Sequence, residues 1–277
     1  MAIVNIIGAG RVGRTFLRLL GSQVQDIASA TRASAETAVK DAGHGRVADL
    51  AEMRPADIWL LTVPDAQIAG TAQALADTQA PAAIAIHCSG FHTADIMSPL
   101  LAKGWLLASV HPNLSFAAPD VSAARFSGTW CGVEGDEEAL RVVEPLFKAL
   151  DARTFRIGTE TKALYHAAAV ITNNFTTVLQ AVALEAWAKA GVPDDVARDL
   201  NVTLLRSTVE NIEKLGPAEA LTGPAARGDR EVVTEQGKQV AEWRPDVGQL
   251  YELLSRMAVN LKTNGVTSDD QDVPPRQ

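Results

Sequence analysis

Six residues near the start of the chain have a composition and spacing that indicate nucleotide binding. Residues 8–13 read Gly-Ala-Gly-Arg-Val-Gly, directly after an apolar run and directly before an amphipathic helical pattern. Gly8 permits a tight turn, Gly10 lets a pyrophosphate approach the backbone, and Gly13 lets helix and strand pack closely. Arg11 and Val12 open the helix, whose free N–H groups attract phosphate. In this strand-turn-helix context the motif predicts a dinucleotide site.

The identity of the dinucleotide is usually decided roughly 20 residues later, where an acid at the end of the second strand binds the ribose of NAD. We predict that strand over residues 27–31, which leaves Asp26 at the wrong end and places Arg32 and Ser34 at the cofactor end. A guanidinium and a hydroxyl suit a 2′-phosphate. The sequence therefore predicts NADP, with NAD as the lesser alternative, unless Arg32 is only a solvated surface residue.

Polar residues and a Val-Pro step follow three further predicted strands. Val63 and Pro64 end one, Ser89 follows the next, and His111 ends the third. Ligands of an open α/β sheet bind outside the carboxyl ends of its strands. We therefore expect Val63 and Pro64 to flank the cofactor, Ser89 to donate to its carboxamide or to substrate, and His111 to act as an acid. Ordinary strand-ending caps and turns are the alternative.

A metal site is not predicted, although His87, Cys88, His92 and His111 lie close together in the sequence. Adjacent residues of a strand point to opposite faces, so His87 and Cys88 do not both reach one ion easily.

A long apolar helical pattern over residues 160–190 carries the remaining proton carriers. At about 100° per residue, one polar stripe forms along it, and we expect this mostly apolar helix to be buried on nearly all sides. The stripe consists of Lys162, His166, Asn173, Thr177 and Gln180. Such a stripe lines a ligand or wet cavity, or else is an exposed polar face. We expect Lys162 or His166 to supply a proton and Asn173, with its neighbour Asn174, to orient a substrate.

The elements that position these residues alternate between strand and helix patterns up to about residue 157. Strands are predicted at 3–7, 27–31, 58–63, 83–88, 106–110, 129–133 and 153–157, and helices beyond them at 160–190, 194–214, 229–242 and 246–263. Such alternation predicts an α/β fold, a doubly wound and mostly parallel Rossmann sheet in residues 1–157. An all-α domain is predicted for residues 158–264 and a disordered tail for 265–277.

Composition limits the partners and the compartment. The 277 residues are 47% apolar and carry a net charge of −8. We find no clustered Lys and Arg, which excludes nucleic acid as the main partner. Two distant cysteines suit a reducing compartment, so cytoplasmic localisation is expected. We see no signal peptide and no uninterrupted apolar run of roughly 20 residues, so no membrane association is expected.

Five segments resemble, in order, the motifs of a little-characterised bacterial family that pairs a Rossmann-like NAD(P)-binding domain with a helical domain of unknown function. They are residues 8–13, 87–90, 111–116, 162–169 and 221–229. The family is related to ketopantoate reductase, pyrroline-5-carboxylate reductase and 6-phosphogluconate dehydrogenase. This resemblance implies a C-terminal domain of the 6-phosphogluconate dehydrogenase type and a homodimer formed through the C-terminal helices.

The chain departs from these relatives at two positions. In the hydroxyacid relatives a helix carries Lys and, four residues later, Asn, whereas here Lys162 is followed by His166. Family members commonly carry a His where this chain has Gln236. The His111-Pro112 step is similar to one near the substrate of prephenate dehydrogenases.

From these observations we expect an NADP(H)-dependent oxidoreductase that reduces a small keto acid or imine in a cleft between the domains. Ketopantoate is the leading substrate. Arg227 is expected to hold a substrate carboxylate by its planar fork, or else to cap a helix or lie in an interface. One alternative is a dinucleotide-binding sensor without turnover. A weaker one is a deazaflavin-dependent NADP reductase.

Overall fold

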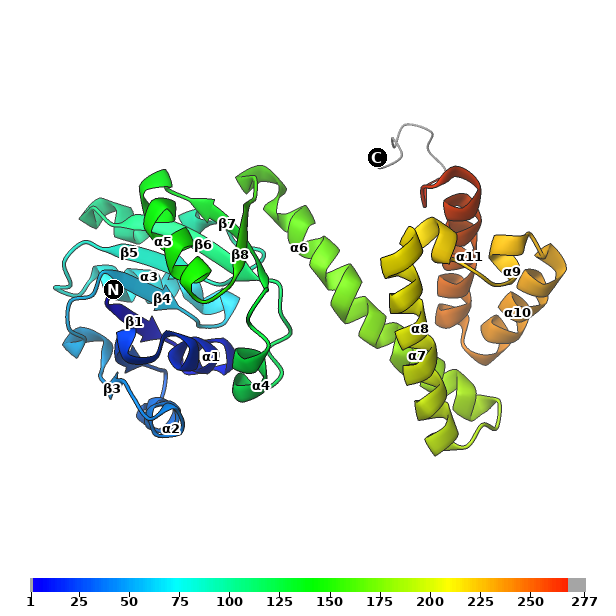
Figure 1. The fold of residues 1–277 in the computed structure, drawn as a ribbon, viewed down its shortest axis with the longest axis horizontal. Coiled ribbons are helices and arrows are strands. Elements are labelled where there is room, and N and C mark those ends of the chain that lie inside the picture. The colour runs from blue at the N-terminus through cyan, green and yellow to red at the C-terminus, as the bar shows by residue number, and fades with distance from the viewer. Residues whose placement is uncertain (1, 269–277) are drawn as a thin grey trace. The chain divides into compact units, whose positions relative to one another are not determined.

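The computed structural model describes residues 2–268 and separates into two compact units, Met1–Thr172 and Asn173–Gln277 (Figure 1). The first holds the sheet, and the second is helical in its described part. The first unit extends past residue 157 because it includes α6 (Lys162–Val170), whose first residue is buried against the sheet. Of the predicted tail, residues 265–268 follow the last helix, and residues 269–277 lie outside the described residues.

Eight strands form one sheet in the order β3-β2-β1-β4-β5-β6-β7-β8. They are β1 (Val4–Ile7), β2 (Val24–Ala28), β3 (Arg46–Val47), β4 (Ile58–Leu61), β5 (Ile84–His87), β6 (Leu106–Pro112), β7 (Trp130–Gly135) and β8 (Arg153–Arg156). The first six are parallel; β7 runs antiparallel to β6, and β8 runs parallel to β7. The predicted Rossmann-type, mostly parallel sheet is confirmed.

The second strand lies earlier in the sequence than predicted. Val24 already pairs with Val4 in β1, and Thr31, predicted as the strand's last residue, instead caps the helix that follows by accepting the Ser34 backbone N–H. Asp26 is therefore inside β2 and fully buried, 2.7 Å from Arg46 and 2.6 Å from Arg54. Burial opposes its ionisation, but hydrogen bonds from both guanidiniums outweigh burial and hold the pKa of Asp26 well below its usual range.

Helices cover both faces of the sheet because its strands are almost continuously apolar and successive side chains point to opposite faces. Ile58 and Leu60 face one layer, whereas Trp59 and Leu61 face the other. The first layer is built mainly from α1 (Arg11–Leu20), α2 (Arg32–Ala42) and α5 (Glu137–Ala149), and the second from α3 (Ile68–Ala76) and the 3₁₀ segment η4 (Ala94–Lys103). A short helix, α4 (Pro119–Ala124), and the 3₁₀ turns η1 (Gly21–Gln23), η2 (Leu50–Glu52), η3 (Asp65–Gln67) and η5 (Thr159–Thr161) complete the unit.

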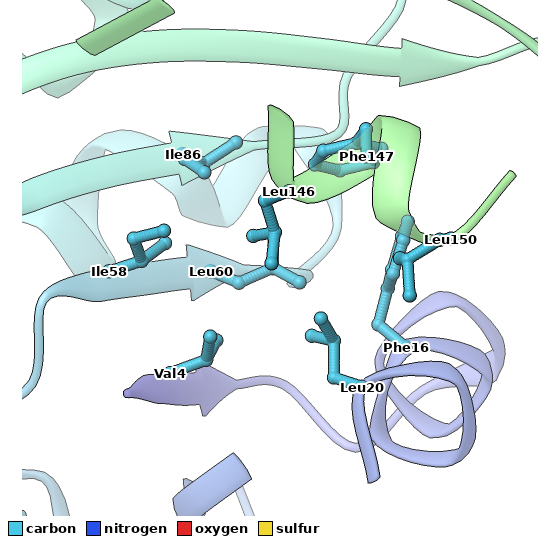
Figure 2. Close-up of a pocket in the computed structure, with 9 residues that line it drawn as sticks. All are labelled: Val4, Phe16, Leu20, Ile58, Leu60, Ile86, Leu146, Phe147 and Leu150. Atoms are coloured by element: carbon cyan, nitrogen blue, oxygen red, sulfur yellow. The ribbon is translucent and has the colours of Figure 1, made fainter. Parts of the chain in front are cut away.

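A small gap remains in the first layer, between the sheet, α1 and α5 (Figure 2). Its volume is about 10 Å³. It is lined only by apolar side chains: Val4, Phe16, Leu20, Ile58, Leu60, Ile86, Leu146, Phe147 and Leu150. A water needs polar partners in addition to space, so this gap is a dry packing defect of the core.

The helix that begins at Lys162 is not a regular α-helix throughout. Residues Ile171–Phe175 (η6) form a π-helical segment between α6 and α7 (Thr176–Lys189). The remaining helices are α8 (Asp194–Ala220), α9 (Pro224–Arg227), α10 (Arg230–Trp243) and α11 (Pro245–Asn264). A π turn inserts a residue relative to an α-helix, so the stripe calculated at a constant 100° does not continue across Ile171–Phe175.

Within the single chain this helix is also far more exposed than the sequence predicts. Leu164 is 73% exposed, and Ile171, Phe175 and Val178 are each more than half exposed. The helical stretch Thr159–Lys189 has the length and mean hydropathy of a membrane span, although polar residues interrupt its apolar run. Length and composition alone indicate such a span weakly. Lys162, near its start, is paired inside the sheet unit.

Candidate functional site

The glycine loop connects β1 to α1 and packs tightly against the end of β4. Gly8 has a φ of 116°, a left-handed conformation that favours glycine. A Cβ on Gly8 would lie 2.7 Å from the Thr62 carbonyl, and a Cβ on Gly13 would overlap the Gly8 carbonyl oxygen. The Thr62 hydroxyl donates to that same oxygen at 2.8 Å. Larger residues at Gly8 or Gly13 would push the loop off the sheet.

Gly10 lies on the open side of this loop. A Cβ there would meet nothing within 4 Å, and Gly10 provides no side-chain cap for α1. Arg11 is exposed and Val12 half-buried. The first N–H groups of an uncapped helix are available to an anion. The loop therefore fits the pyrophosphate of a dinucleotide.

A groove of about 530 Å³ opens beside the loop. It is lined by Ile7, Gly8, Ala28, Ser29, Ala30, Asp49, Leu50, Val63, Ala66, Gln67, Gly70, Thr71 and Ala74, which come from the ends of β1, β2 and β4, the residues after β3, and α3. Small and apolar residues dominate this lining, which suits a flat ring and a sugar. Asp49 is the one carboxylate in it. The sequence prediction missed Asp49 because the two-residue β3 is too short to show a strand pattern.

Arg32 and Ser34 lie in the first turn of α2, outside the lining of that groove. The Ser34 hydroxyl lies 2.8 Å from the Thr31 hydroxyl, and Arg32 Nε lies 3.2 Å from Glu36 Oε1. Both Arg32 and Glu36 are more than half exposed, and an exposed pair of this spacing is worth only about 0.4 kcal/mol. Arg32 is therefore free to exchange this partner for a phosphate.

The residues after β4 and β5 are joined by hydrogen bonds. Val63 lines the groove and Pro64 is exposed. Ser89 Oγ donates to Asp65 Oδ2 at 2.8 Å and accepts the backbone N–H groups of Phe91 and His92 at 3.2 and 3.0 Å. A hydroxyl has one proton and two lone pairs. The predicted donation from Ser89 to a ligand would therefore require it to leave Asp65.

Two predicted site residues, His111 in β6 and His166 in α6, meet above Gly90. Their rings are nearly perpendicular, at 88°, with centroids 5.5 Å apart. A Cβ on Gly90 would lie 2.8 Å from His111 Nε2 and would overlap the His166 ring. Burial, and then the nearby His166 and Lys162, lower the pKa of His111 to about 4. His111 is therefore neutral at pH 7.

Two residues that the sequence analysis assigned no role complete this cluster. Tyr165 Oη lies 2.8 Å from His111 Nδ1 and 2.7 Å from Asn113 Nδ2. Tyr165 precedes His166 in the motif at 162–169 but lies outside the polar stripe, and Asn113 belongs to the motif at 111–116. The spacing of polar residues along one helix therefore did not reveal them.

Lys162 is held in a buried ion pair. Its side chain is 1% exposed, and Nζ donates to Glu134 Oε1 at 2.8 Å and to Ser109 Oγ. Glu134 Oε1 also accepts the Ala94 backbone N–H at 2.8 Å. Burial lowers the pKa of Lys162, while Glu134 opposes that shift. Glu134 was missed because only the antiparallel β6–β7 register brings it opposite Ser109.

His87 is fully buried and has a structural role. Its Nδ1 accepts the Ser89 backbone N–H at 3.1 Å, and its Nε2 lies 3.0 Å from the Thr93 carbonyl oxygen. Burial is the main cause that lowers the pKa of His87 to about 4. Within residues 2–268, no group of three or more His, Cys, Asp or Glu side chains is placed to hold a metal ion.

The other predicted site residues belong to the second unit. Asn173 and Asn174 are exposed in the π-helical segment, and Asn173 Nδ2 lies 3.4 Å from Asn174 Oδ1. Arg227 ends α9, is exposed, and pairs with Asp229 at 3.1 Å. Their roles toward a substrate stay predictions.

Two family models match successive parts of the chain. A Rossmann-like domain model matches residues 2–112, and the model of a domain of unknown function, DUF2520, matches residues 129–258. The chain pairs a Rossmann-like domain with a DUF2520 domain. The Rossmann-like match includes Gly90 and His111, whereas the DUF2520 match includes Glu134 and Lys162 together with Tyr165 and His166. The cluster is thus assembled from both matched regions.

Solved structures resemble the chain over almost its whole length. Protein TM1727 of Thermotoga maritima is 27% identical, with a TM-score of 0.77 over 95% of this chain and 99% of that one. A provisionally assigned NADP oxidoreductase of Bacteroides fragilis is 25% identical, with a TM-score of 0.75 over 94% and 98%. A pyrroline-5-carboxylate reductase of Coxiella burnetii shares the fold, at 16% identity and a TM-score of 0.59 over 97% and 99%.

No curated protein matches the sequence significantly. Together, the loop geometry and these likenesses support NAD(P) binding and an oxidoreductase role in general.

Proposed function

We propose that the chain is an NADP(H)-dependent oxidoreductase that reduces the C=O or C=N bond of a small keto acid or imine. One observation carries this proposal: a glycine loop that fits a dinucleotide and a pair of perpendicular imidazoles lie at the carboxyl edge of one sheet. A nicotinamide cofactor, when bound, supplies the hydride. The relatives give no support for ketopantoate, so the proposal names a bond and a substrate class.

The side chains of the cluster have distinct proposed roles. His111 and His166 present ring nitrogens to the substrate atom that gains a proton. Lys162 is too firmly paired to deliver that proton, so we assign it a positioning role: it fixes the first turn of α6 to β6 and β7. The bond from Ser89 to Asp65 similarly fixes the residues after β5 relative to those after β4.

Preference for NADP is assigned to the first turn of α2. The Arg32 guanidinium is exposed and weakly paired, and the Ser34 hydroxyl lies two residues further along. Both side chains can bind a 2′-phosphate by charge-assisted hydrogen bonds. The Asp49 carboxylate in the groove would repel that phosphate at short range. The preference is therefore measured as the ratio of the Kd values for NADPH and NADH.

The test is a titration of the purified protein with NADPH and with NADH, followed by nicotinamide fluorescence. We expect Arg32→Ala to raise the Kd for NADPH at least tenfold and to leave the Kd for NADH unchanged. Arg141→Ala is the matched control, because Arg141 is also exposed and paired with a glutamate, Glu138, on its own helix. It should change neither Kd.

Three outcomes would contradict parts of the proposal. Binding of neither cofactor would overturn dinucleotide binding, and tighter binding of NADH would overturn the NADP preference. If NADPH binds but no keto acid or cyclic imine in a screen oxidises it, the reductase assignment fails and a sensor without turnover takes its place.

A further inference from the structure

We propose that Tyr165, held by Asn113, fixes His111 as the tautomer that carries its proton on Nε2, so that His111 donates a hydrogen bond to substrate and His166 carries the transferred proton. The division of roles between the two imidazoles rests on the proposed function. The tautomer itself does not, because it follows from hydrogen bonds within the chain.

The orientation of the Asn113 amide is the first step. The Trp130 carbonyl oxygen accepts the Asn113 backbone N–H at 2.9 Å, and Asn113 Nδ2 lies 3.2 Å from the same oxygen. A carbonyl oxygen only accepts, so the NH₂ end of the amide must face it. The same NH₂ group lies 2.7 Å from Tyr165 Oη. Asn113 therefore donates to the Tyr165 hydroxyl.

The single proton of Tyr165 is the second step. Burial raises the pKa of Tyr165, so the hydroxyl keeps its proton at neutral pH. Within the described residues the other hydrogen-bond partner of Oη is His111 Nδ1, at 2.8 Å. A proton on Nδ1 would leave the hydroxyl proton without an acceptor among the described residues, so we assign the hydroxyl as the donor to Nδ1, with the ring proton on Nε2.

The packing around the His111 ring leaves space for the Nε2 proton beside Gly90. The Tyr165 and His166 rings each lie 5.5 Å from the His111 ring, at 87° and 88°. His111 Nε2 lies beside Gly90, where a Cβ would come within 2.8 Å of it. A Cβ at Gly132 would likewise lie 2.7 Å from the Tyr165 hydroxyl. Two glycines thus leave room for the two ends of the Tyr165–His111 pair.

The surrounding charges oppose a second proton on His111. Lys162 and His166 of α6 oppose that proton, and Asp65 after β4 favours it. A proton on Nδ1 would also end the bond that Nδ1 accepts from Tyr165. His166, whose ring makes no hydrogen bond to Tyr165 within the described residues, is the member of the pair left to take up and release a proton.

The experiment is long-range ¹H–¹⁵N NMR of the full chain labelled in histidine, which reports the protonation of each ring nitrogen directly. The His111 signals are assigned by their loss in His111→Gln. We expect an unprotonated Nδ1 and a protonated Nε2 at pH 7. Tyr165→Phe should produce a mixture of tautomers and raise the pKa of His111. Tyr251→Phe, at the other tyrosine of the chain, removes a hydroxyl bonded to Gln236 and should leave the His111 signals unchanged.

Two results would overturn the tautomer assignment whatever the protein's activity. One is a proton on Nδ1 in the unmodified protein, and the other is a set of unchanged His111 signals in Tyr165→Phe while the His87 signals stay intact. The division of roles is tested separately, by NADPH oxidation across pH. We expect His166→Gln to abolish the ionisation that controls kcat and His111→Gln mainly to raise KM. The reverse pattern would overturn that division, whereas failure to bind NADPH would overturn only the proposed function and the roles that rest on it.

Discussion

Two imidazoles, the buried His87 and the half-buried His111, make folding stability depend on pH in a calculable way. His87 and His111 each have a pKa of about 4 in the folded chain, against about 6.5 in an unfolded one. Above pH 6.5 both states leave these rings neutral and their contribution is fully present. As pH falls toward 4, the unfolded chain binds protons that the folded chain does not, so stability is lost. At pH 5 the loss is about 2 kcal/mol for each ring, or about 4 kcal/mol together, relative to pH 8.

Urea denaturation at pH 8, 6 and 5, followed by circular dichroism, measures this loss. His87→Gln is the informative variant, because its amide can accept the Ser89 N–H and donate to the Thr93 carbonyl without titrating. It should remove about half of the pH dependence. His44→Gln, next to β3 at the opposite edge of the sheet from β8, is the matched control and should keep the full dependence. Equal stability at pH 5 and pH 8, or an unchanged slope in His87→Gln, would refute the reasoning.

Three further predictions concern the site and the assembly. Lys162→Met leaves Glu134 buried without its cation and should lower the free energy of unfolding by about 3 kcal/mol; a loss below about 1 kcal/mol in urea would mean that the pair is not buried in solution. Gly90→Ala should displace both imidazoles and lower kcat for NADPH oxidation at least tenfold while the Kd for NADPH stays unchanged, and full activity would contradict the packing. We propose that the exposed apolar residues of η6 and α7 contribute to a homodimer. Phe175→Glu should then convert a dimer to a monomer in analytical ultracentrifugation, whereas a monomeric unmodified protein would exclude that assembly.

The sheet and the glycine loop were predictable because their signals are local. Residues 8–13 combine a turn, a close approach of the backbone to phosphate and a helix start within six positions. Short continuous apolar runs predict strands buried on both faces. The second strand was misplaced because Thr31, a good strand former, instead caps α2. A cap depends on how the chain turns after the strand, which apolar periodicity does not report.

The site itself was only partly predictable. His111 and His166 were recognised as proton carriers, but their meeting above Gly90 depends on how α6 packs against the sheet. Lys162 was predicted as a site residue from its residue type. Its partner Glu134 was not, because the antiparallel pairing of β6 and β7 cannot be predicted from a pattern of alternating strands and helices. The polar stripe assumed a uniform helix, and the π turn at Ile171–Phe175 removes that assumption.

The parallel course of α6 and β6 has a consequence for how this site tolerates change. Lys162 bonds to Ser109 and Tyr165 bonds to His111, so about one helical turn is matched to two strand residues. From Lys162 to Tyr165 a helix rises about 4.5 Å, and two strand residues advance by about 6.6 Å, a difference within the length of the side chains that bridge it. Inserting one residue between Lys162 and Tyr165 would rotate Tyr165 by about 100° and separate it from His111, even with the ion pair intact. The spacing between Lys162 and Tyr165 is therefore fixed by the two contacts. A related chain that kept both residue types at another spacing would have lost this arrangement.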